Sequence, residues 1–319
     1  MAGVTGPAGA RRTLGVVMPS YHRPDLLRRV VPAYLAQAPD ELVVVLDGPQ
    51  PPARAFLSTL DDPRLRVLEL AENVGPARAR ERGAHAARTE IVLLTDDDIV
   101  PGDGLVDRHR AFHQGRRGCV LAGYVPIRPD GRRRGQVASR IYATDYERAM
   151  RRWERDPDAI LGGLWGGNVS LERDLYLRAE AVRPQDRLRY FEDMDLGLRL
   201  RSLGARGFFD RAVTGVHLHD KPNRSIVDEA RARGAAVRAM ERRWTASPPL
   251  VHAEDESAVV TWLRRVVAAS LRLPGLVSLV VVLLRGMLEA AGALRLWRVE
   301  DLSARLLRGV IEIQAYVRG

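Results

Sequence analysis

Short strand-like runs alternate with helix-like segments through the first hundred residues of the chain. The strand-like runs cover residues 14–18, 42–46, 66–70 and 91–94. The segments between them have helical spacing and cover residues 25–37, 53–60 and 76–87. A buried parallel strand reads as a short continuous apolar block, and strands that alternate with helices are typical of βαβ units. We therefore predict an α/β fold with a mostly parallel central sheet.

The pattern is less regular after Pro101. Helices are expected at residues 103–113, 139–155 and 196–203, and strands at residues 120–125 and 208–218. A glycine-rich stretch with an embedded Trp165 covers residues 162–170. The first strand is not followed by Gly-x-Gly-x-x-Gly, which weakens a dinucleotide-binding interpretation.

Helical sequence rich in Ala, Arg and Leu begins near Ser225. Residues 273–284 carry no charge and lie between Arg272 and Arg285. A helix needs about 20 apolar residues to span a bilayer, so this run favours a core or interface helix. Because arginines surround apolar surface here, contact with a membrane surface stays open as an alternative. We expect a flexible N-terminus at residues 1–12, a main domain at 13–225 and a helical C-terminal region at 226–319.

Composition and charge narrow the class of protein. The 319 residues are 46% hydrophobic and 28% charged, an ordinary globular balance, and the formal net charge is +10. This excess of arginine indicates polyanionic partners such as nucleotide diphosphates or anionic lipids. Nucleic acid is not expected, since the basic residues are dispersed and only 6% of the residues are aromatic.

The single Cys119 excludes an intrachain disulfide and a zinc site made of several cysteines. Residues 1–12 lack the apolar stretch of a secretory signal. Both features fit a reducing compartment, so the expected location is cytoplasmic, or peripheral at the inner face of the membrane.

Three consecutive aspartates follow the fourth strand-like run: Asp96, Asp97 and Asp98. Ligands of open α/β sheets gather at the carboxyl ends of the strands. Three carboxylates in one place repel one another unless a cation lies among them, and a hard divalent metal with oxygen ligands suits that task. A helix cap or an exposed acidic turn is the alternative.

Other motifs accompany the triplet in a fixed order along the chain. They are Pro19-Ser20-Tyr21-His22-Arg23-Pro24, Asp47-Gly48, residues 73–83, residues 95–101, Gly166-Gly167-Asn168, residues 191–201, and His217 with His219. In this order and at these separations, the chain resembles the inverting family 2 glycosyltransferases of GT-A fold over about residues 13–225. The resemblance implies a Rossmann-like nucleotide-diphospho-sugar transferase domain.

The resemblance also implies a site for a nucleotide sugar, with the base and ribose at the ends of the first two strands. The residues implied for donor binding are Pro19, Tyr21, Arg23, Asp47, Arg80, Asp96, Gly167 and Asn168. For three of these residues, a purely structural role is the alternative to donor binding. Asp47 suits a turn before Gly48, Tyr21 suits packing, and Arg80 suits a solvated helix face.

A metal site is implied by the same resemblance. Its ligands would be Asp97 or Asp98, together with His217, and which aspartate of the triplet binds stays open. Imidazole beside carboxylate suits Mn²⁺, whereas Mg²⁺ prefers oxygen ligands, so the expected cofactor is Mn²⁺ or Mg²⁺.

The catalytic base implied by the resemblance is Asp193, which would take the proton of the acceptor hydroxyl. We expect the nearby carboxylates Glu192 and Asp195 to raise the pKa of Asp193, because like charges disfavour ionisation. A capping acid before the helix at residues 196–203 is the alternative.

Together these features predict a metal-dependent inverting glycosyltransferase. It would move a sugar from a nucleotide-diphosphate sugar to an acceptor hydroxyl by single displacement. The acceptor would be a sugar, a lipid-linked molecule or a small molecule, and the oligomeric state, a homo-oligomer included, stays open. The alternatives are a nucleotide-sugar-binding regulatory protein without transfer, and a nucleotidyltransferase.

Overall fold

The computed structural model of the chain describes residues 11–127, 136–184, 188–218, 222–244 and 274–318. It divides into two compact units. Unit 1 comprises residues 1–128, 148–184 and 193–218, and unit 2 comprises residues 129–147, 185–192 and 219–319. Two internal segments therefore group with the C-terminal helices. The predicted boundaries at residues 12/13 and 225/226 stay a prediction, and residues 1–10 of the predicted lead lie outside the described residues.

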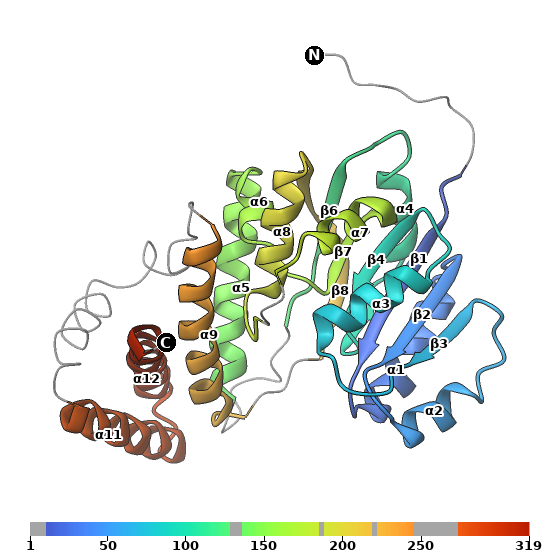
Figure 1. The fold of residues 1–319 in the computed structure, drawn as a ribbon. Helices are drawn as coiled ribbons and strands as arrows, with labels where there is room; N and C mark the ends of the chain where they lie inside the picture. The colour runs from blue at the N-terminus through green and yellow to red at the C-terminus, as the bar shows by residue number, and fades with distance from the viewer. Residues whose placement is uncertain (1–10, 128–135, 185–187, 219–221, 245–273, 319) are drawn as a thin grey trace. The chain divides into compact units, whose positions relative to one another are not determined.

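Unit 1 is built on a sheet with the strand order β3-β2-β1-β4-β7-β6-β8-β5 (Figure 1). The strands are β1 (Leu14–Ser20), β2 (Glu41–Leu46), β3 (Leu65–Glu69), β4 (Ile91–Thr95), β5 (Ile99–Pro101), β6 (Cys119–Tyr124), β7 (Asn168–Glu172) and β8 (Arg206–His217). The first four strands pair in parallel, as predicted. The rest is mixed, because β7 is antiparallel to β4 and to β6, and β5 is antiparallel to β8. The α/β prediction is confirmed, and the sheet is parallel chiefly in its first half.

Five of the seven helices described in unit 1 lie close to predicted positions, and the other two do not correspond to any predicted helix. The seven are α1 (Pro24–Ala36), α2 (Pro51–Leu57), α3 (Pro76–Ala86), α4 (Leu105–Phe112), α6 (Ala159–Gly162), α7 (Arg173–Ala181) and α8 (Glu192–Ser202). Proline stands in the first turn of α1, α2 and α3, where its missing N–H would have no helical partner. The short β5, β7, α6 and α7 were not predicted.

The two faces of the sheet are covered by different helices. Val16 and Val44 belong to an apolar core that includes residues of α1. Successive side chains of a strand point to opposite faces, so Val17 and Val45 face the other side, against α3. A Cβ on Gly83 of α3 would lie 2.5 Å from Val17 Cγ1 and 2.8 Å from Val45 Cγ2. Glycine at this position therefore lets α3 pack directly on the strands.

Unit 2 is helical, as predicted for the C-terminal region. Its helices are α9 (Ser225–Arg243), α11 (Pro274–Ala293) and α12 (Trp297–Arg318), and α5 (Val137–Arg155) begins in this unit. Its apolar core includes Val137, Ile226, Leu288 and Leu307. A buried ion pair joins Arg233 to Glu312 at 3.0 Å. Among the described helices, none combines the length and the apolar character needed to cross a bilayer.

Candidate active site

The acidic triplet lies where β4 ends, beside the carboxyl end of β1. Ser20, the last residue of β1, donates a hydrogen bond of 2.6 Å from Oγ to Asp97 Oδ2. The Nη1 atom of Arg23 lies 3.0 Å from Asp97 Oδ1 and 2.9 Å from Asp98 Oδ2. Burial raises the pKa of Asp97 to about 6, although Ser20 and Arg23 act in the opposite direction. A cationic side chain thus lies between two carboxylates that would otherwise repel each other.

The β5–β8 pairing brings His217 to the triplet. Ile99 of β5 is paired with His217, and the Nε2 atom of this histidine lies 3.1 Å from Asp98 Oδ1. Two donors of one octahedral ion at about 2.1 Å from the metal lie about 3 Å apart, so this spacing fits a shared cation. No group of three His, Cys, Asp or Glu side chains in the described part of the chain is arranged to hold a metal. Substrate phosphates and water commonly supply the remaining ligands of such an ion.

Asp96 and Asp193 meet at the guanidinium of Arg80. This buried side chain of α3 donates from Nη2 to Asp96 Oδ1. Its Nη1 atom lies 3.6 Å from Asp193 Oδ1. One arginine therefore joins the triplet at the end of β4 to the carboxylate predicted as the base, which lies far away in the sequence.

Asp193 lies in the first turn of α8 and is held by the glycine-rich stretch. The backbone N–H of Gly166 donates to Asp193 Oδ2 at 2.9 Å. The pKa of Asp193 is raised, first by burial and then by the charge of Asp96, while Arg80 and the Gly166 N–H lower it. The like charge seen to raise the pKa of Asp193 is that of Asp96, whereas Asp195 is buried in an ion pair of 3.0 Å with Arg199. The contributions predicted for Glu192 and Asp195 stay a prediction.

Gly167 and Asn168 form the link between this stretch and β7. A Cβ on Gly167, which has φ +93°, would lie 2.7 Å from Ile99 Cδ1 and 3.0 Å from Asp96 Oδ2. Asn168 is buried, and its Nδ2 donates to the carbonyl oxygen of Val213 at 3.0 Å. The glycine thus allows close approach to the triplet, whereas the asparagine side chain is directed into the protein.

A chain of buried hydrogen bonds leads from Asn168 to α4, and sequence reasoning did not find it. His109 lies 2.7 Å from Asn168 Oδ1 and 2.7 Å from Ser170 Oγ, and His113 Nε2 lies 2.8 Å from the same hydroxyl. Asn168 Oδ1 can only accept, so the Nε2 of His109 donates and its Nδ1 accepts from Ser170. Burial lowers the pKa of His109 to about 4 and that of His113 to about 3, which keeps both rings neutral at pH 7.

The remaining predicted donor-binding residues lie at the ends of β1 and β2. Pro19 is buried inside β1, beyond the last residue that pairs with β4. Tyr21 is 49% exposed, so its ring is accessible for stacking. Both carboxylate oxygens of Asp47 accept backbone N–H groups, from Val74 at 2.7 Å and Gly75 at 2.9 Å. Asp47 therefore fixes the turn that begins α3, the helix that carries Arg80.

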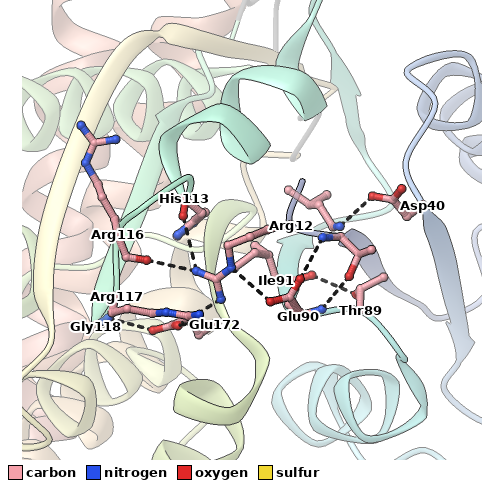
Figure 2. A network of polar contacts seen from close by, with 12 residues as sticks. Arg12, Asp40, Thr89, Glu90, Ile91, His113, Arg116, Arg117, Gly118 and Glu172 are labelled. Carbon is pink, nitrogen blue, oxygen red and sulfur yellow. Dashed lines mark hydrogen bonds and ion pairs between the residues drawn. The ribbon is translucent and has the colours of Figure 1, made fainter. Parts of the chain in front are cut away.

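A second polar cluster lies where β1 begins, on Arg12 (Figure 2). Arg12 donates to Glu172 Oε1 at 3.0 Å and to the carbonyl oxygen of Arg116 at 3.0 Å. Arg117 donates to the same carboxylate at 2.8 Å. A cavity of about 200 Å³ adjoins these residues. Arg12 and Arg117 both pair with Glu172, so these residues tie the start of β1 to the end of β7, away from the predicted site at the end of β4.

Comparison with solved structures supports the class of protein that this fold defines. The chain is similar to a mannosyltransferase, PcManGT from Pyrobaculum calidifontis, solved in complex with GDP-Man and Mn²⁺. The TM-score is 0.60 at 20% sequence identity, and the match covers 97% of this chain and 89% of the other. The likeness shows a shared fold, that of a GT-A glycosyltransferase.

The family follows from the sequence comparison. The family model "Glycosyl transferase family 2" matches residues 15–175, about half of the chain. The chain is also 37% identical over 92 residues to the succinoglycan biosynthesis protein ExoO of Rhizobium meliloti (strain 1021), a match that spans 28% of this chain and 26% of that protein. The chain belongs to glycosyl transferase family 2.

Proposed function

We propose that the chain is a metal-dependent, inverting glycosyltransferase that uses a nucleotide-diphosphate sugar. The observation that carries the proposal is the Arg80 guanidinium, which contacts both Asp96 at the end of β4 and Asp193 in the first turn of α8. A base and a donor site must adjoin each other for single displacement, and this arginine joins the two predicted halves. The structural relative bound to GDP-Man and Mn²⁺ supports the donor class and the metal.

The proposed reaction is one displacement at the anomeric carbon. The acceptor oxygen forms a bond to that carbon as its proton passes to the Asp193 carboxylate. The bond from the anomeric carbon to the diphosphate oxygen breaks on the opposite face, and the diphosphate leaves with the electron pair. The raised pKa of Asp193 suits this role, because a stronger base accepts the proton more readily near neutral pH.

Asp98 and His217 are the residues proposed to hold the divalent cation, with Asp97 beside them. Their carboxylate and imidazole donors suit Mn²⁺, and their 3.1 Å separation fits two ligands of one ion. When bound, the cation would stabilise the negative charge of the departing diphosphate. Arg23 and Arg80 each supply a positive charge in contact with the triplet.

The proposed donor pocket begins at the exposed ring of Tyr21, which could stack on the base. Asp47 orders the turn before α3 and would approach the ribose with its remaining lone pairs. Gly167 lets the backbone approach Asp96 closely, and a sugar would lie beside these two residues. Pro19 and Asn168 would act from inside the protein, by fixing the strand ends that shape this pocket.

The proposed acceptor is a sugar or a lipid-linked sugar, with a small molecule as the alternative. Similarity to a protein of succinoglycan biosynthesis supports a saccharide acceptor. The buried, unpaired Cys119 supports a reducing compartment, so a cytoplasmic location is proposed. No nucleic acid is part of this proposal, and a homo-oligomer stays a prediction.

Asp193→Asn tests the base. The new amide oxygen can still accept from the Gly166 N–H, so the fold of the site should persist. With a panel of nucleotide sugars and Mn²⁺, we expect transfer to fall by a factor of about 10² to 10⁴ while nucleoside-diphosphate affinity stays within about two-fold. Asp174→Asn, an exposed carboxylate on α7, is the matched control and should transfer normally.

Three results would contradict parts of the proposal. Full transfer by Asp193→Asn would remove this residue as the base. Tight binding of a nucleotide sugar by the unaltered protein, with neither transfer nor slow hydrolysis, would indicate a regulatory binder. Release of pyrophosphate from a nucleoside triphosphate and a sugar phosphate would indicate a nucleotidyltransferase.

A further inference from the structure

Helix α11 of unit 2 has two apolar faces, and only one of them is packed. Val277, Leu284, Leu288 and Ala291 are buried in or against the helical unit. These positions recur at intervals of seven, four and three residues, which places them along one stripe of a helix with 3.6 residues per turn. Packing against the rest of the unit accounts for this stripe alone.

The other stripe is large and exposed. Leu279 is 53% exposed, Val282 64%, Leu283 57% and Met287 48%. They recur at the spacing of a single helix face, roughly opposite the buried stripe. Gly286 lies among them, and a Cβ built there meets no atom within 4 Å. We call these four residues the outer face of α11.

The outer face continues into the turn between α11 and α12. Leu294 is 69% exposed and Leu296 is 49% exposed. Arg295, between them, has φ +57°, a conformation unusual for a residue other than glycine, and its side chain is exposed. Apolar side chains and a guanidinium thus share one end of the helix pair.

The exposed charges beside this surface are mainly positive. Arg285, Arg295 and Arg298 are exposed, and Glu289 is the exposed carboxylate on α11. The next two carboxylates along the chain both contact Arg140, whose Nη2 lies 2.7 Å from Oε2 of the buried Glu300 and 2.9 Å from Oδ1 of the partly exposed Asp301. These two acids share the charge of Arg140, so the guanidinium groups at the rim outnumber the carboxylates that face them.

We propose that the outer face of α11 and the adjoining turn bind an anionic lipid surface, with the helix lying in the plane of the interface. Exposed Leu, Val and Met with arginines at the rim are the features of a helix that enters the headgroup boundary by about 5–10 Å. A second copy of the chain fits less well, because a symmetric contact would bring like-charged arginines together. The proposal concerns lipid binding alone and does not depend on the proposed transfer reaction.

Co-flotation of the full chain with vesicles tests the proposal without donor or acceptor. We expect most of the protein to float with vesicles of 30% phosphatidylglycerol in phosphatidylcholine, and little with phosphatidylcholine alone. Val282→Glu with Leu283→Glu should lower flotation at least five-fold. Both side chains are exposed, so circular dichroism should be unchanged. Val182→Glu, at an apolar residue of unit 1 that is 57% exposed, is the matched control and should float normally.

The charge requirement is tested by Arg295→Glu with Arg298→Glu, which should weaken flotation with the anionic vesicles. Absence of flotation of the unaltered chain, or flotation that the Val282/Leu283 double variant leaves unchanged, would overturn the proposal. Light scattering after size-exclusion chromatography tests whether a second copy of the chain, and not lipid, covers the outer face of α11. A dimer of the unaltered chain that becomes a monomer in the double variant would assign the face to a second copy instead of lipid.

Discussion

The guanidinium of Arg23 lies 2.9 Å from a carboxylate oxygen of Asp98. The same Nη1 atom lies 3.0 Å from Asp97, so one internal cation contacts two members of the acidic triplet. A divalent metal held by these carboxylates would have to share or displace this contact. Arg23 is half-exposed and precedes α1, which leaves its side chain free to turn towards the phosphates of a donor.

Arg23→Gln should therefore change metal and nucleotide binding in opposite directions. Loss of the competing charge should tighten Mn²⁺ binding about five-fold without nucleotide, which corresponds to about 1 kcal/mol for a partly exposed ion pair. Nucleoside-diphosphate affinity in the presence of Mn²⁺ should fall. Electron paramagnetic resonance of free Mn²⁺ measures the first effect and calorimetry the second. Arg29→Gln, an exposed arginine on the same helix, should change neither. Weaker Mn²⁺ binding by the Arg23 variant would contradict the competition.

The contact between Arg80 and Asp193 predicts a shift in the pH dependence of transfer. Asp193 must be ionised to act as a base, so kcat/KM should fall as the pH drops through its raised pKa. Arg80 lowers that pKa, so Arg80→Gln should move the acidic limb of the profile to higher pH. Arg80→Lys, which keeps the charge, should move it less. Arg82→Gln, at an exposed residue of α3, should leave it in place. If the acidic limb of the kcat/KM profile stayed at the same pH in Arg80→Gln, Asp193 would not be the base whose titration produces it.

His109 and His113 predict a loss of stability in mild acid. Their folded-state pKa values of about 4 and about 3 lie below the ordinary value near 6.5. The unfolded chain therefore binds protons that the folded protein excludes. The neutral histidines therefore contribute to the free energy of unfolding. Their contribution is complete above about pH 6.5 and is lost as the pH falls towards 4, by up to about 1.4 kcal/mol per pH unit for each histidine.

Urea unfolding of His113→Gln between pH 5 and 7 measures this effect. The glutamine amide can still donate to Ser170, but one titrating group is gone, so about half of the contribution of the pair should vanish. In His85→Gln, at an exposed histidine of α3, the free energy of unfolding should change with pH as steeply as in the unaltered protein. If the free energy of unfolding depended on pH equally steeply in His113→Gln and in the unaltered protein, the ring of His113 would not be responsible for the loss of stability in acid.

Much of the fold could be predicted because β1, β2 and β4 are buried, largely apolar runs, and the half-buried β3 still alternates with the helices in the same way. Their helices begin at prolines and cover both faces, so strand–helix alternation was enough to place β1 to β4 and α1 to α3. The strand β7 has no such pattern. Asn168, Ser170 and Glu172 alternate with apolar residues, and the first two are buried with hydrogen bonds to His109 of α4 and to His113, the residue that follows this helix. That compensation is long-range and has no local signal.

Some contacts of the candidate site could also be predicted from the sequence, and others could not. Strand ends and motif order led to Asp98 and His217, which do lie in contact, and to Arg80, which does lie beside Asp193. The partner of Asp195 was missed, because an ion pair with Arg199 depends on the burial of that face of α8. Individual roles at the site stay predictions.

The contact between Gly166 and Asp193 yields a test that alters the position of the proposed base and not its chemistry. A Cβ on Gly166 would lie 2.6 Å from both carboxylate oxygens of Asp193, so Gly166→Ala must displace that side chain. A displacement of about 1 Å can cost about 100-fold in rate, so we expect kcat to fall by that order while nucleoside-diphosphate affinity is kept. Gly163→Ala is the control, since its Cβ would meet its nearest atom at 3.5 Å. If single-turnover kinetics gave both variants the rate of the unaltered enzyme, the placement of Asp193 by Gly166 would have no part in transfer.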